Sequence, residues 1–175
     1  MTSMPLHPLL VHMPLGLALL LPALAIAVTW ALWTGRLQPR AWLSIVLLQA
    51  LLEGAGLLAL NTGQHEGDRV EAFVPKMALE THEEYAEQFL WIAGITLAVS
   101  AVVLAVPRSA VRPLTSVAIL GTLMVAGAAL RVGHAGGRLV YVHNAGAAYV
   151  TGNKANAHLQ NGTDFTPPPK SRDDD

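Results

Sequence analysis

The sequence predicts an all-α integral membrane protein, a four-helix up-down bundle with both termini on the outer side of the membrane. Hydrophobic residues make up 53 % of its 175 residues and charged residues only 13 %, against roughly 25 % charge in a soluble domain. The charges gather between four long apolar runs, which leaves too little polar sequence to cover four buried helices of a soluble protein. This composition excludes an ordinary soluble enzyme and a disordered chain. The absence of cysteine excludes disulfides and thiolate metal sites, and the scattered basic residues exclude a nucleic-acid partner.

Each apolar run is long enough to cross a bilayer core of about 30 Å, which takes roughly 20 helical residues. Backbone groups in lipid must be hydrogen-bonded internally, so each run is expected to be a helix. The expected spans are residues about 9–33, 42–60, 83–106 and 114–134.

The first span is expected to be retained and not cleaved as a signal peptide, because residues 1–35 hold no Lys or Arg. Residues 1–152 would form the membrane domain, and residues 153–175 a polar, disordered tail. Between the last span and the tail, residues 136–143 are too few for a fifth span. They are expected to form a separate segment packed on the outer face of the bundle.

The short connections set the expected orientation. Residues 35–41 and 107–113 each hold two Arg and no acidic residue, whereas residues 61–88 hold two basic and seven acidic ones. The positive-inside rule therefore places the two Arg loops in the cytoplasm. Three tryptophans fall at the same level, where they would form an aromatic belt: Trp30, Trp33 and Trp42.

Six of the seven histidines fall at the outer ends of the spans: His7, His12, His65, His82, His134 and His143. Imidazole is a common ligand of metals and of haem iron, and helical bundles build such sites from inward-facing side chains. His12 is the strongest candidate, because it lies inside an apolar run where an unpaired polar group is costly. Its helical face continues through mostly small residues, which would admit a flat cofactor: Gly16, Leu19, Ala23 and Ala27. The face of His82 continues through Ala86, Phe89, Ala93 and Ser100.

A flat haem between diagonal helices would take one axial histidine from each. The best pair on the sequence is His12 with His82, and a second pair, His65 with His134, lies nearer the rim. Arginines on the same side could hold the propionates or simply extend to the interface: Arg69, Arg131 and Arg138.

A copper or zinc site is the alternative. It would take three or four of the six histidines together with nearby carboxylates: Glu66, Asp68, Glu83 and Glu84. The spacing does not favour this, because His7 and His12 are five residues apart and would point about 140° apart on a helix. A third interpretation is that interfaces simply tolerate histidine.

One carboxyl falls inside a span. Glu53 lies near the middle of the second span, with Gln49 one turn earlier on the same face. A carboxyl in the bilayer is a functional candidate, for instance a proton relay or a quinone contact. The alternative is a protonated, hydrogen-bonded side chain that only helps the helices pack.

Three segments resemble a bacterial membrane family called domain of unknown function 2231. They are His7-Pro-Leu-Leu-Val-His-Met-Pro-Leu-Gly16, then Thr62-Gly63 with His82, then Gly133-His-Ala-Gly-Gly-Arg-Leu-Val-Tyr141. The resemblance covers most of residues 7–150. It implies four spans in a bacterial inner membrane, ligand-like histidines at His12 and His82 facing the periplasm, and electron transfer with cytochrome or Rieske-type partners. Many members carry Gly where His143-Asn144 stands here.

Together these features predict a b-type haem protein that transfers electrons at the outer face of the membrane, with the haem held by two histidines. Such ligation leaves no open position on the iron, which favours a redox relay or subunit over an enzyme. The expected partners are the lipid bilayer, a quinone or cytochrome, and a second copy of the chain. Two other functions stay open: a copper or zinc binding or transport protein, and a non-catalytic partner subunit in which the histidines are incidental.

Overall fold

The computed structural model describes residue 7 and residues 10–71 and 73–146, apart from the side chains at 66, 68 and 69. The expected tail, residues 153–175, and the side chains of Glu66, Asp68 and Arg69 therefore lie outside the described residues. The elements are α2 (His12–Trp33), the short 3₁₀ helix η1 (Pro39–Trp42), α3 (Leu43–Val70), α4 (Lys76–Val102) and α5 (Arg108–Tyr141).

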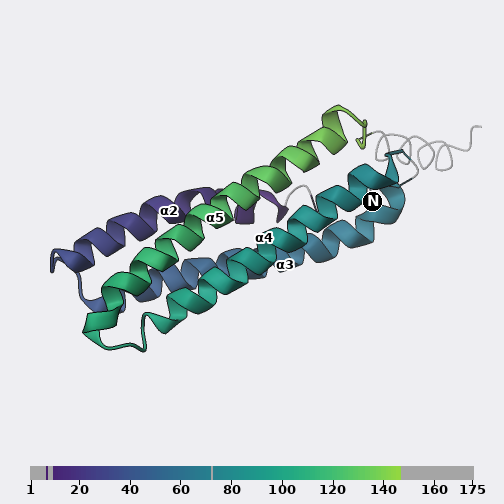
Figure 1. Ribbon diagram of the computed structural model, residues 1–175. Helices are drawn as coiled ribbons and strands as arrows, with labels where there is room; N and C mark the ends of the chain where they lie inside the picture. Colours follow the sequence, from purple (N-terminus) through teal and green to yellow (C-terminus); the bar gives the residue numbers. More distant parts are fainter. Residues whose placement is uncertain (1–6, 8–9, 72, 147–175) are drawn as a thin grey trace, which may run out of the picture.

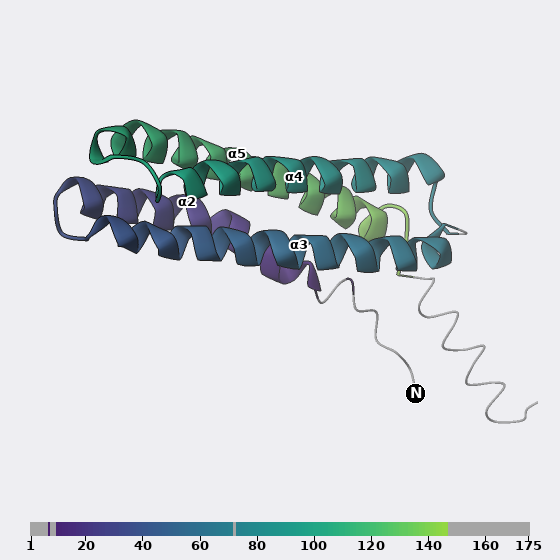
Figure 2. The same ribbon diagram turned by 90° about the horizontal axis from the view of Figure 1, so that it is seen from below.

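The described chain is all-helical, as predicted, and four of its helices are long and apolar enough to cross a membrane. They run alternately up and down and lie alongside one another (Figures 1 and 2). Helix α2 packs against α3 and α5, and α4 packs against the same two. Helices α2 and α4 are therefore diagonal partners, as are α3 and α5.

The two ends of the bundle differ. We call the end that carries the α2–α3 and α4–α5 connections the loop end. The opposite end, where α3 and α5 finish and α4 starts, is the histidine end (Figure 1).

The helices extend further at the histidine end than the apolar runs do. Helix α3 continues ten residues past the expected end at residue 60, and α4 starts seven residues before the expected start at residue 83. Hydropathy identifies only the apolar part of a helix, whereas the backbone hydrogen bonds of the helix continue through polar residues. The extension is held by a small second core of Val70, Val74, Leu139 and Ala145, with Ala78 and Leu79 packed against it.

The expectation of a separate segment at residues 136–143 is wrong. Helix α5 is continuous to Tyr141, and its last turns form part of the extension. The helix stops where Asn144 takes a positive φ of 55° and the amide of Ala145 donates to the Leu139 carbonyl at 3.0 Å. A left-handed residue followed by such a bond is a common helix end, and Asn tolerates that conformation.

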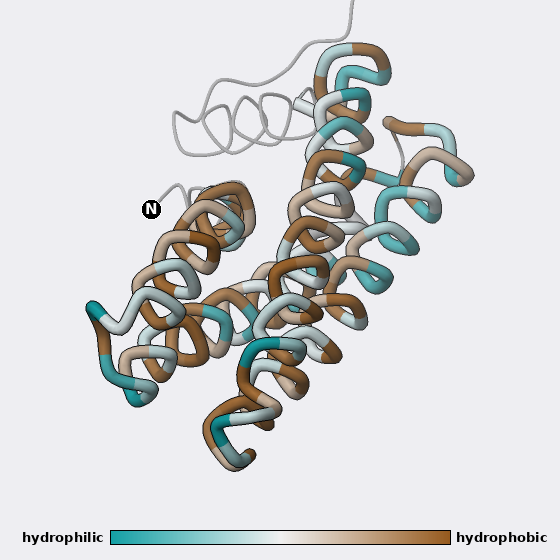
Figure 3. Tube along the Cα trace, turned by 60° about the vertical axis from the view of Figure 1, so that its left-hand side comes forward, coloured by the Kyte–Doolittle hydropathy of each residue, from teal (hydrophilic) through white to brown (hydrophobic). Residues whose placement is uncertain are grey.

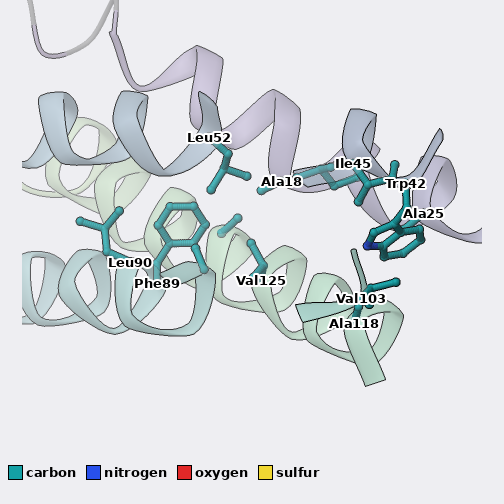
Figure 4. Packing of buried hydrophobic residues seen from close by; sticks show 13 residues of the cluster. Ala18, Ala25, Trp42, Ile45, Leu52, Phe89, Leu90, Val103, Ala118 and Val125 are labelled. Carbon is teal, nitrogen blue, oxygen red and sulfur yellow. The ribbon is translucent and has the colours of Figure 1, made fainter. Parts of the chain in front are cut away.

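The main core is built mostly from alanine and branched aliphatic side chains, together with the aromatic rings of Phe89 and Trp42 (Figure 4). Its thirteen buried residues are Ala18, Leu21, Ala25, Trp42, Ile45, Leu52, Phe89, Leu90, Ala93, Val103, Ala118, Val125 and Ala129. The outward faces are also apolar along much of each helix (Figure 3). Leu20, Leu58, Trp91, Leu120 and Leu130 are each at least 60 % exposed. Apolar side chains outside a packed core suit a helix surrounded by lipid.

Trp42 does not join an aromatic belt. Its side chain is fully buried, and its Nε1 donates to the Ser100 carbonyl at 3.0 Å. It therefore closes the loop end of the core. Trp30 and Trp33 are exposed as expected, with the guanidinium of Arg36 lying 4.4 Å from the Trp30 ring centroid.

Close helix contacts depend on glycine at a few places, which gives a test of the packing. A Cβ on Gly121 of α5 would lie 2.7 Å from Cγ2 and Oγ1 of Thr96 on α4, whereas one on Gly127 would meet nothing within 4 Å. We expect Gly121→Ala to destabilise the protein by about 1–3 kcal/mol, the usual cost of overpacking. Gly127→Ala, on the same helix, should have little effect. Thermal unfolding in detergent, followed by circular dichroism, measures both, and equal midpoints would contradict this packing.

Candidate functional site

The histidine end brings two imidazoles together, those of His7 and His82. Their ring centroids are 6.4 Å apart and their planes stand at 80° to each other. His82 lies on the second turn of α4. His7 precedes α2, and its carbonyl accepts the amide of Val11 at 3.1 Å, as in a helical turn. The two rings thus come from diagonal sides of the bundle.

Helix α3 holds the His7 ring in place. Nδ1 of His7 lies 2.8 Å from the carbonyl oxygen of Ala59. Since a carbonyl only accepts, Nδ1 carries the proton, and Nε2 keeps its lone pair free to bind a metal or accept a hydrogen bond. Gly63, one turn further along α3, leaves room for the ring, because a Cβ there would lie 2.9 Å from Cε1 of His7.

The His82 ring packs against a glycine of helix α5, as the His7 ring does against a glycine of α3. A Cβ on Gly136 would lie 3.1 Å from Cε1 of His82, so only glycine leaves the ring its full space. Nδ1 of His82 is buried and has no hydrogen-bond partner among the described residues. A buried polar atom without a partner is costly. Each imidazole therefore rests on a glycine of a neighbouring helix, and one of them has a ring nitrogen free.

The expectation that the His12 face looks into the bundle is wrong. His12 is exposed, and so are the residues along its face: Gly16, Leu19, Ala23 and Ala27. The buried face of α2 instead carries Pro14, Ala18, Leu21 and Ala25. His7 lies seven residues, or two helical turns, before Pro14, so it falls on the buried face. Helical periodicity could therefore have predicted an inward His7, but the apolar residues around His12 favoured His12. The expected inward face of His82 is confirmed, because Phe89, Ala93 and Ser100 are buried.

The other histidines do not join the pair. His65 and His134 are exposed and His143 is half-buried. In the described part of the chain, no three His, Asp or Glu side chains are close enough to hold a metal ion. His134 instead borders an apolar cavity of ≈ 180 Å³ between α2 and α5, beside Leu15 and Leu130.

A cation packs on a tyrosine of α4. The guanidinium of Arg131 is 4.4 Å from the ring centroid of Tyr85, which lies three residues after His82 on α4. This contact places a positive charge beside a residue one helical turn along α4 from His82. Arg138 is exposed in the last turn of α5.

Gln49 and Glu53 lie in the apolar middle of α3. Gln49 is only 4 % exposed, and neither of its side-chain polar atoms has a hydrogen-bond partner among the described residues. Oε2 of Glu53 is also buried and unpaired there. Oε1 of Glu53 lies beside α4, 3.5 Å from where a Cβ of Gly94 would be. Both side chains thus point into the bundle, one turn apart.

No family model, curated protein or solved structure matches this chain.

The packing of the His7 ring against α3 can be tested directly. We expect the wild-type protein to show His7 protonated on Nδ1, because that atom donates to the Ala59 carbonyl. Gly63→Ala should push the ring away and lose this signature, whereas Gly54→Ala, where a Cβ meets nothing within 4 Å, should keep it. Nitrogen-15 NMR of histidine-labelled protein measures the tautomer, with His7→Gln identifying the signal. An unchanged His7 signal in Gly63→Ala would show that the ring does not rest on α3.

Proposed function

We propose that this chain is a membrane protein that binds one b-type haem between His7 and His82 and transfers electrons at the histidine end of the bundle. The observation that carries the proposal is the number and placement of the ligands. Two imidazoles, from opposite sides of the bundle, approach each other.

Two ligands suit haem better than a single metal ion. Zinc sites take three or four protein ligands, whereas haem iron already has four porphyrin nitrogens and needs only axial ligands. Two imidazoles on opposite sides of one metal, each with its nitrogen about 2 Å from it, have centroids roughly 6 Å apart. The observed separation of 6.4 Å fits that arrangement.

The residues around the pair supply what such ligands need. The bond from Nδ1 of His7 to the Ala59 carbonyl orients the ring and leaves Nε2 as the ligand atom, the usual support of a metal-bound histidine. His82 has an unpaired buried ring nitrogen. Arg131, held on Tyr85, supplies a positive charge for an anionic propionate.

This ligation decides the kind of chemistry. With His7 and His82 both holding the haem, the iron would supply one-electron redox chemistry and would have no open position for substrate, which favours a redox relay or subunit over an enzyme. We further propose that the histidine end faces the periplasm of a bacterial inner membrane. The charge of the connections supports this orientation, and the family resemblance implies the membrane. A quinone or a cytochrome is the redox partner that this location favours.

The first test is the optical spectrum of detergent-purified protein, made with ample haem, before and after reduction with dithionite. We expect a Soret band that shifts and a sharp α band on reduction. His7→Ala and His82→Ala should each lower haem affinity by more than about tenfold, because even supporting residues of a metal site are worth 10–100-fold. His12→Ala is the matched control, since His12 is exposed, and it should keep wild-type haem content.

Each contrary result has a definite meaning. A protein without a visible spectrum contradicts haem binding, and stoichiometric copper or zinc in that protein would favour the metal-binding alternative. Loss of haem in His12→Ala but not in His7→Ala would show that His12 and His82, not His7 and His82, hold the haem. A stable copurifying protein without any cofactor would favour a structural subunit.

We also propose that Glu53 takes up a proton when the site is reduced, because its buried Oε2 has no partner among the described residues. A redox site coupled to one proton has a midpoint potential that falls by up to about 59 mV per pH unit. Glu53→Gln should flatten this pH dependence, whereas Glu80→Gln, at a 62 % exposed position, should not. Redox titration between pH 5 and 9 measures both, and parallel slopes in wild type and Glu53→Gln would remove Glu53 from the proton path.

A further inference from the structure

A small cavity lies in the middle of the main core, where α2, α3, α4 and α5 meet. Its volume is ≈ 10 Å³. Three polar side chains line it, Gln49, Thr96 and Thr122, and the rest of the wall is aliphatic. All three polar residues are at most 5 % exposed. The cavity is therefore a polar pocket in the apolar centre of the bundle.

The two hydroxyl groups in this pocket can only accept hydrogen bonds from an occupant. Oγ1 of Thr96 donates its proton to the Ile92 carbonyl at 2.7 Å, and Oγ1 of Thr122 donates to the Ile119 carbonyl at 2.7 Å. Each hydroxyl has only one proton, which it already donates, so toward an occupant its oxygen can only accept a hydrogen bond through a lone pair.

Gln49 adds both a donor and an acceptor. Its Nε2 and Oε1 are buried and have no hydrogen-bond partner among the described residues. The pocket thus holds three acceptor oxygens and one amide nitrogen with two protons to donate. An occupant that satisfies it must donate at least one hydrogen bond and also accept one.

From this pattern we infer that the pocket is a binding site for a single water molecule. A cavity of about 10–15 Å³ holds one water, provided that two to four polar groups surround it. Water can accept a hydrogen bond from the Gln49 amide and donate one to each of two of the three oxygens. A monovalent cation would satisfy the oxygens but would leave the protons of Nε2 without an acceptor. The inference goes beyond the proposed function and does not depend on haem binding.

Such a water would tie three helices together. Gln49 belongs to α3, Thr96 to α4 and Thr122 to α5, and no direct hydrogen bond joins these three side chains in the described chain. A bridging water is nearly as favourable in enthalpy as a direct hydrogen bond. It would fix how α3 is rotated about its axis relative to the α4–α5 pair.

Magnetisation transfer from water to the Gln49 side-chain amide tests the inference on the wild-type protein. In a sample labelled with nitrogen-15 at glutamine, we expect a cross-peak between the Gln49 amide protons and a bound water. Gln49→Leu identifies the signal. The absence of a cross-peak would overturn the inference. A shift of the Gln49 signal when sodium replaces choline would also overturn it, in favour of a cation.

Stability gives a second, independent measurement whose sign differs between a wet and a dry pocket. If water is bound, Gln49→Leu leaves it short of partners and lowers the unfolding midpoint. If the pocket is dry, the same change removes an unpaired buried amide and raises the midpoint. Gln88→Leu, at an exposed position on α4, is the control for the substitution itself. Thr122→Val should also lower the midpoint more than Thr62→Val, because Thr62 bonds helix carbonyls in the same way but lies away from the pocket.

Discussion

The close approach of the helices at small residues is the constraint on which the rest of this structure depends. Where a glycine faces a neighbouring helix, that helix can place a side chain directly against the backbone. Leu90 packs against Gly56 in this way, and Thr96 packs against Gly121. The imidazoles of His7 and His82 pack against Gly63 and Gly136. The same device that packs the apolar middle of the bundle thus also positions the paired histidines at its end. A methyl group at any of these contacts would push the neighbouring side chain away from the helix that it packs against.

The buried polar groups divide the bundle into two halves of different chemistry. Among the described residues, six polar side chains are buried, and all lie between the level of Glu53 and the loop end: Thr29, Gln49, Thr96, Ser100, Thr115 and Thr122. Several of the hydroxyls donate to carbonyls of their own helix, which satisfies them without a partner on another helix. Thr29, Gln49 and Ser100, in the same half, keep buried side-chain polar atoms without a partner among the described residues. The histidine end carries the paired imidazoles, of which His82 likewise has a buried ring nitrogen without a partner there.

The sequence predicted the four helices and their neighbours well, because long apolar runs joined by short connections permit few arrangements. It could not predict where the helices end, since polar residues after Leu60 and before Glu83 continue a helix as readily as apolar ones. The candidate site was harder still. The apolar residues around His12 suggested burial, but a lipid-facing surface is apolar too, so hydropathy does not separate the inside of a membrane bundle from its outside. Helical periodicity does separate the two faces, and it places His7, not His12, on the inward face.

The two cores also imply different local stabilities. The main core buries thirteen hydrophobic side chains, whereas the core of the extension at the histidine end buries four. Segments with few buried contacts open at a lower free-energy cost than the rest of a protein. Gly136, against which the His82 ring packs, belongs to the stretch of α5 beside this small core. A large, flat molecule could therefore reach the paired imidazoles through brief local unfolding of the extension, while the part of the bundle around the main core stays intact.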